Sequence, residues 1–104
     1  MYICLSLFLV VVKPGIPEDK ELHDLANDVS PVWKRLGREL KVDDSKLSQL
    51  DVDRQQDAYE KAFQMLQYWK QNRANQATYQ ILYSALTSTV VSRNDLGKKY
   101  CEFT

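Results

Sequence analysis

The sequence has few of the residues from which active sites and metal centres are built. It has one histidine, two cysteines and three glycines among 104 residues. His23 has no second histidine with which to share a metal ion, and Cys4 and Cys101 lie near opposite ends instead of forming a CxxC pair. The glycines match neither GxGxxG nor GxxxxGK. We therefore predict no enzyme activity, no metal and no cofactor, and we interpret the cysteines as reduced thiols of a cytosolic protein.

The sequence also lacks net charge. Fourteen basic residues balance fourteen acidic residues, so no overall field draws the chain to nucleic acid or to an anionic membrane. A hydrophobic content of 44% excludes the composition typical of disordered chains. The length predicts one globular domain, and any electrostatic recognition must be local.

A long hydrophobic run is missing as well. Residues 1–12 are almost wholly apolar, and the run ends at the Pro and Gly residues before Glu18. A membrane span needs about 20 apolar residues. The run also lacks the basic start and small-residue cleavage site of a signal peptide. A truncated membrane span and an incidental extension remain as interpretations. We predict an N-terminal extension and linker over residues 1–17 and a domain over residues 18–104.

From Glu18 onward, apolar residues recur at the spacing of amphipathic helices, with short polar breaks between segments. The first helix is expected over residues 19–28. Ser30 is a candidate N-cap, and Pro31 occupies the favoured first position of a second helix. A short third helix is expected after Asp43.

The same pattern continues through the second half of the chain. Asp53, with Gln56 three residues later, resembles a capping box and predicts the start of a long fourth helix. A fifth helix is expected over residues 79–86 and a sixth after Ser92 and Asn94. Because no heptad repeat survives the breaks, the pattern predicts an all-α, six-helix antiparallel bundle and not a coiled coil.

Three large aromatic residues lie on the apolar stripes of these helices. At helical spacing, nearby leucines or alanines share one helix face with each of them, namely Trp33, Phe63 and Trp69. We expect them in the core and not in a binding site.

Charge is arranged in blocks although the total cancels. The second predicted helix is basic, and the turn and helix that follow it are acidic. The basic block comprises Lys34, Arg35, Arg38 and Lys41, and the acidic block comprises Asp43, Asp44, Asp51 and Asp53. Such a bipolar surface could pair head to tail with a copy of itself or with a related partner. The alternatives are a solvated face with ordinary intrachain pairs and a basic helix that binds nucleic acid.

Residues 33–47 carry the pattern W-x-x-L-x-R-x-L, then a polar turn with an acid and a lysine-hydrophobic pair. This stretch resembles the second and third helices of adaptor death domains. Residues 66–70 resemble the family's fourth helix, in which a leucine precedes a tryptophan by three residues, and residues 77–86 resemble its fifth. From about Glu21 to Tyr100, the chain is similar to the death domain family, and most of all to the death domain of the Fas-associated death domain adaptor.

The resemblance implies a Greek-key arrangement of the six helices, the death fold. It also implies binding to other death-domain proteins, whether receptors, adaptors or kinases, in apoptotic or innate-immune signalling. In the adaptor, an arginine, a valine and an acid contact the receptor; by position these resemble Arg38, Val42 and Asp44. The predicted protein-binding residues are Lys34, Arg35, Arg38, Lys41, Val42, Asp43, Asp44 and Asp51.

The chain departs from that adaptor in one respect. The adaptor carries a death-effector domain ahead of its death domain, and nothing before Glu18 resembles one. We therefore expect a fragment, the cytoplasmic tail of a receptor, or a single-domain competitor that occupies partners without passing on a signal.

Overall fold

Helices make up most of the described chain, which in this computed structural model comprises residues 12–52 and 56–102. Within these ranges there are six α-helices. They are α2 (Asp19–Val29), α3 (Trp33–Glu39), α4 (Asp44–Asp51), α5 (Ala58–Arg73), α6 (Tyr79–Leu86) and α7 (Asn94–Cys101). Two short 3-10 helices, η1 (Ser30–Val32) and η2 (Ala74–Gln76), join α2 to α3 and α5 to α6. The predicted all-α, six-helix bundle is confirmed for this part of the chain.

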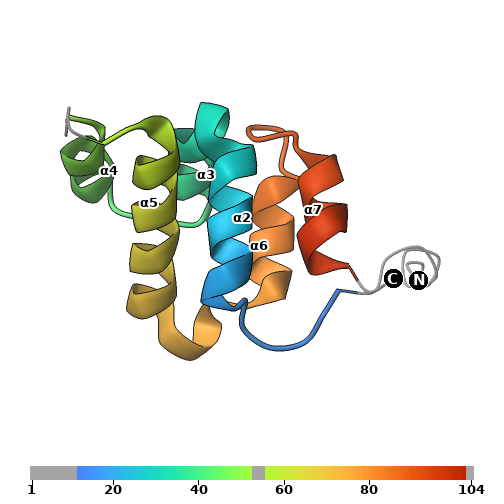
Figure 1. Ribbon diagram of the computed structural model, residues 1–104. Coiled ribbons are helices and arrows are strands. Elements are labelled where there is room, and N and C mark those ends of the chain that lie inside the picture. The colour runs from blue at the N-terminus through green and yellow to red at the C-terminus, as the bar shows by residue number, and fades with distance from the viewer. Residues whose placement is uncertain (1–11, 53–55, 103–104) are drawn as a thin grey trace.

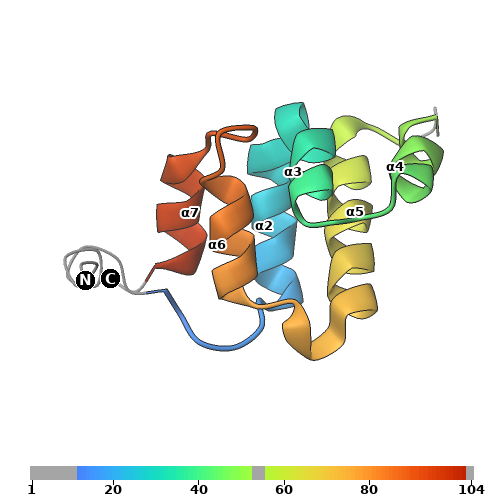
Figure 2. The same ribbon diagram turned by 180° about the vertical axis from the view of Figure 1, so that it is seen from behind.

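The long helix α5 packs against α2, α3 and α4, and α6 packs against α7. Figures 1 and 2 show α4 beside α5 at one end of the bundle and α7 beside α6 at the other. The charged start of α4 therefore lies far from α7.

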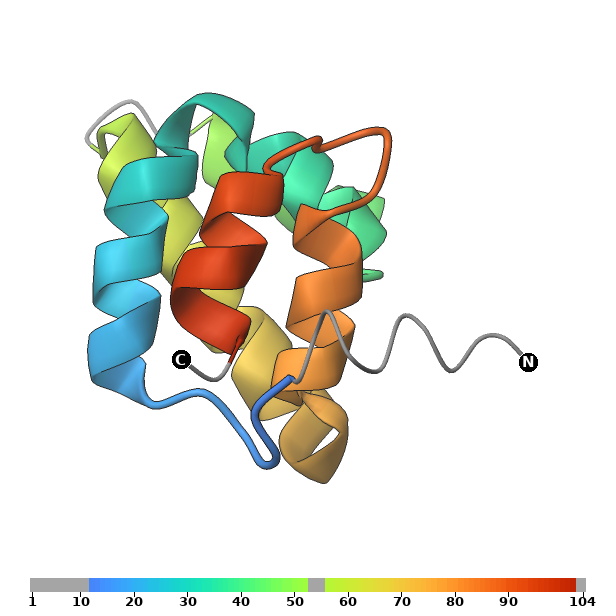
Figure 3. The same ribbon diagram turned by 90° about the vertical axis from the view of Figure 1, so that its right-hand side faces the viewer.

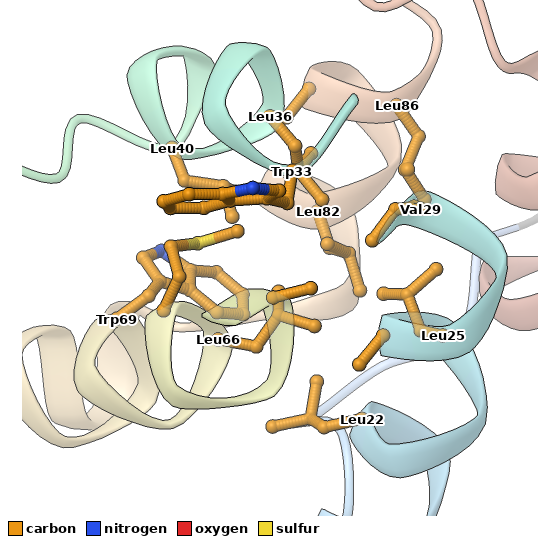
Figure 4. Packing of buried hydrophobic residues seen from close by; sticks show 14 of the residues in the cluster. Leu22, Leu25, Val29, Trp33, Leu36, Leu40, Leu66, Trp69, Leu82 and Leu86 are labelled. Atoms are coloured by element: carbon orange, nitrogen blue, oxygen red, sulfur yellow. The ribbon is translucent and has the colours of Figure 1, made fainter. Parts of the chain in front are cut away.

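Large apolar side chains fill the space between the helices (Figure 4). Leu22, Leu25 and Val29 of α2 are buried among residues of α5 and α6. The core prediction for the three aromatic residues is confirmed, since Trp33 is 7% exposed, Phe63 9% and Trp69 1%. Burial of such side chains is the main source of stability in a bundle of short helices.

The start of α5 differs from the prediction. The helix begins at Ala58, where the Asp57 carboxylate accepts a hydrogen bond from the Glu60 amide at 2.9 Å. Gln56 lies in a bend before the helix, and Asp53 lies outside the described residues. The capping box predicted from Asp53 and Gln56 was therefore wrong as a helix start, because Asp57 caps the free amide instead.

The junction between α2 and α3 also differs. Ser30 has helical backbone angles (φ −51°, ψ −38°), whereas an N-cap residue usually has an extended backbone. Its hydroxyl donates to the carbonyl of Asn27 at 3.2 Å. Ser30 therefore caps the end of α2, Pro31 lies in the 3-10 turn, and α3 begins at Trp33.

The segment before α2 lies against the bundle (Figure 3). Val12 forms an antiparallel β-bridge with Glu102, and the Lys13 amide donates to the Cys101 carbonyl at 2.8 Å. Pro17 is fully buried. Residues 12–17, expected to be part of a linker, thus cross from the end of α7 to the start of α2. The domain boundary near Pro17 stays a prediction.

Most of the apolar run, residues 1–11, lies outside the described residues, as does Cys4. None of the helices that the structure describes is long and apolar enough to cross a membrane.

Candidate protein-interaction surface

A turn held by main-chain hydrogen bonds joins the two helices that carry the predicted binding residues. The Lys41 amide donates to the Arg38 carbonyl at 3.1 Å, and the Val42 amide donates to the Gly37 carbonyl at 2.9 Å. This pair of bonds is a Schellman motif, with Lys41 in the left-handed position (φ 66°) that glycine usually fills. From the end of α5, Arg73 Nη2 donates to the Lys41 carbonyl at 3.0 Å. The turn is therefore anchored on both sides.

Gly37 brings α3 close to α4 and α5. A Cβ atom added at Gly37 would lie 2.6 Å from Leu47 Cδ2 and 3.3 Å from Met65 Cγ. A larger residue would push the helices apart or force Leu47 to move. The relative positions of the charges on α3 and α4 depend on this close contact.

Charged side chains of both signs are exposed around this turn. Arg35 and Arg38 are exposed on α3, Lys41 is exposed in the turn, and Asp43 and Asp44 are exposed at the start of α4. None of these five forms an ion pair with another residue of the described chain. Their charges are therefore directed to solvent.

Asp43 and Asp44 lie at the start of α4, where negative charge interacts favourably with the helix dipole. Asp43 occupies the N-cap position, yet its side chain makes no capping hydrogen bond. The Asp43 side chain is exposed.

Lys34 and Asp51, by contrast, bind each other. Lys34 Nζ lies 2.6 Å from Asp51 Oδ2, with 38% and 44% of the two side chains exposed. The hydrogen bond from Lys34 holds the pKa of the Asp51 carboxyl below its usual value. Lys61 Nζ also donates to the Asp51 carbonyl at 2.6 Å. The alternative of ordinary intrachain pairs therefore applies to Lys34 and Asp51.

Comparison with known families agrees with this architecture. The family model described as "Death domain" matches residues 19–98. The chain belongs to the death domain family. No curated protein and no solved structure matches it. The match supports the all-α death fold, and it makes the chain an interaction module of the homotypic kind.

One predicted binding residue of this death domain does not fit a surface role. Val42 is 6% exposed and packs in the core. In a Schellman motif, the residue after the left-handed position commonly makes an apolar contact back to its helix, and Val42 occupies that place. Its side chain therefore supports the turn and is not available to a partner, which corrects the prediction for Val42.

Sequence reasoning missed two residues that brace this surface of the death domain. Lys61 and Arg73 both reach it from α5, at separations of 10 and 32 residues from the carbonyls they contact. No local pattern marks a long basic side chain that donates to a distant carbonyl. The apolar stripe of α5 indicates only that both residues lie on the polar side of that helix.

In the described chain, the imidazole of His23 and the thiol of Cys101 both pack against other side chains. His23 is an exposed helix-face residue whose ring stacks on Phe63 at a centroid distance of 3.8 Å. Cys101 is buried, and burial raises the pKa of its thiol to about 12. Among the described residues, no group of three or more His, Cys, Asp or Glu could hold a metal ion.

Proposed function

We propose that this chain is a death domain that binds other death-domain proteins through the α3–α4 surface. We define this surface as Arg35, Arg38, Lys41, Asp43 and Asp44. The observation that carries the proposal is that these exposed charges of both signs lie around one anchored turn without partners in the described chain. Complementary charge on a partner would supply specificity and fast association.

The proposed setting is apoptotic or innate-immune signalling in the cytoplasm. The resemblance of residues 33–47 to the Fas-associated adaptor supports it, because Arg38 and Asp44 take the positions of that adaptor's receptor contacts. We propose a receptor, adaptor or kinase death domain as the partner.

A second candidate is the cytoplasmic tail of a membrane receptor that carries this domain. The apolar run of residues 1–12 favours it. Sequencing of the full-length transcript would distinguish the two, because about ten further apolar residues upstream of Tyr2 would complete a span.

A third candidate is a basic helix that binds nucleic acid. The exposed acids Asp43 and Asp44 beside Arg38 oppose it, because phosphate would be repelled from the same surface. Binding to duplex DNA that falls steeply with salt would favour this candidate over protein binding.

The test is light scattering coupled to size exclusion on the full chain, alone and mixed with a panel of death domains. We expect a complex with at least one of them, and we expect Arg38→Glu to abolish it while the variant stays folded. Lys98→Glu, an exposed residue of α7, is the matched control and should bind as the natural chain does. Failure of the chain to bind any death domain would overturn the proposal, as would equal loss in both variants.

A further inference from the structure

We infer that the α3–α4 surface also pairs with the same surface of a second copy around a two-fold axis, and is covered in that pair. The inference concerns the surface of the proposed function and rests on it. It adds that partner binding and self-pairing exclude each other.

The first argument is the separation of charge across the surface. Arg35 and Arg38 are exposed on the α3 side, Lys41 is exposed in the turn, and Asp43 and Asp44 are exposed on the α4 side. A patch that is positive at one end and negative at the other becomes complementary to itself after a rotation of 180°. Arg38 of each copy then faces Asp44 of the other, so the contact forms twice.

The second argument is that the two charged groups are held at a fixed separation. The Lys34–Asp51 ion pair joins the first turn of α3 to the last turn of α4. The left-handed turn at Lys41 and the close approach at Gly37 fix the other end of the same unit. A surface whose groups are already ordered loses less conformational entropy when it binds.

The third argument concerns charges elsewhere on the molecule. The net charge is zero, so two copies do not repel each other overall. Elsewhere, two ion pairs each join an exposed side chain to a half-buried one, Asp19 to Lys70 and Lys99 to Asp28. The charges of the α3–α4 surface are of both signs, and none of them forms an ion pair with another described residue.

The contact would be small and polar, so the pair should be weak and sensitive to salt, which screens charges over about 8 Å at physiological ionic strength. A weak pair can be displaced by a partner death domain that offers the same charges with a larger contact. Self-pairing then lowers the apparent affinity for the partner as the concentration of the chain rises.

The test uses sedimentation equilibrium on the full chain at low salt. We expect the natural chain to approach the mass of a dimer, and we expect Arg38→Glu and Asp44→Lys each to be monomeric. A mixture of the two variants should restore the dimer. In the mixed pair the introduced glutamate faces the introduced lysine, and Asp44 of the first variant faces Arg38 of the second. The double variant Arg38→Glu/Asp44→Lys should also dimerise. Asp24→Lys and Lys98→Glu, outside the surface, should dimerise as the natural chain does.

The outcomes separate this inference from the proposed function. A natural chain that stays monomeric at all concentrations but binds a death domain through Arg38 overturns the inference alone. A dimer that forms, in a chain that binds no other death-domain protein, overturns the proposed function and the competition between partner and copy, and leaves the two-fold pair standing. Species that keep growing with concentration indicate head-to-tail association and overturn the two-fold arrangement. If the inference and the proposed function both hold, Arg38→Glu/Asp44→Lys still dimerises but no longer binds a partner death domain whose charges are unchanged. Circular dichroism on each variant identifies any that fail to fold, and Arg35→Glu with Asp43→Lys is the replacement pair.

Discussion

Lys34 Nζ lies 2.6 Å from Asp51 Oδ2, so one ion pair joins the start of α3 to the end of α4. Folding lowers the pKa of Asp51, chiefly through the hydrogen bond from Lys34. A lowered folded pKa stabilises the fold above the unfolded pKa, usually 3.8 for this group, and the stabilisation is lost as the pH falls through the folded pKa. We expect Lys34→Met to lower the melting temperature slightly at pH 7 and to have no effect near pH 2. An equal deficit at both pH values would mean that Lys34 acts through packing.

Gly37→Ala should destabilise the domain by about 1 to 2 kcal/mol. The new methyl group would overlap Leu47 Cδ2, an overpacking that costs about 1 to 3 kcal/mol, and the better helix propensity of alanine offsets part of this. Urea denaturation measures the change. Combining it with Leu47→Val should cost less than the sum of the two single changes, because valine leaves room for the methyl group. Strict additivity would show that the two positions do not contact each other.

Lys41→Gly should be more stable than Lys41→Ala by about 0.5 to 1 kcal/mol. Both changes remove the charge, but only glycine accepts φ 66° without strain. The comparison of the two in urea denaturation isolates the backbone from the charge. Equal stability of the two variants would show that the left-handed backbone at position 41 is not strained.

Trp69→Ala should cost about 3 to 5 kcal/mol, a large fraction of the stability of a domain of this size. Trp69 is 1% exposed, and its Nε1 is buried without a hydrogen-bond partner in the described chain. Trp69→Phe should cost much less than the alanine change, because it keeps an aromatic ring and removes an unpaired donor. Thermal unfolding followed by circular dichroism tests both variants. A cooperative melt of Trp69→Ala that matches the natural chain would contradict the core assignment.

Tyr100 should make the fold sensitive to alkali. Burial and the hydrogen bond that its hydroxyl donates to Asp28 at 2.6 Å raise its pKa to about 12. A raised folded pKa stabilises the fold fully below the unfolded pKa of about 10, and this stabilisation is lost as the pH rises toward the folded value. We expect Tyr100→Phe to reduce the loss of melting temperature between pH 9 and 12, and Asp28→Asn to shift the phenol titration to lower pH. An unchanged titration in Asp28→Asn would exclude Asp28 as a cause.

The sequence predicted features that depend on neighbouring residues, and it did not predict contacts between residues far apart in the chain. The apolar stripes predicted the six helices and the buried places of Trp33 and Trp69, because helical periodicity is a local property. The cap of α5 was misplaced, since Asp53 and Asp57 both satisfy the rule and only the folded chain selects one of them.

The predicted surface divided in a way that no local pattern could show. Lys34 and Asp51 are 17 residues apart and meet only after α3 and α4 pack together. Val42 lies between exposed charges in sequence, yet the Schellman turn directs its side chain inward. The remaining exposed charges are therefore fewer than the two blocks suggested, and their separation is set by tertiary packing.

The bridge between Val12 and Glu102 brings the two described ends of the chain together. Residues paired in this way have Cα atoms about 5 Å apart, so a linker of a few residues could join them without disturbing α7 or the segment before α2. The path of the described chain is therefore nearly closed. Cutting it elsewhere, in an exposed turn, should give a circular permutant with the same fold, and the joined ends would allow the whole domain to be inserted into a loop of another protein.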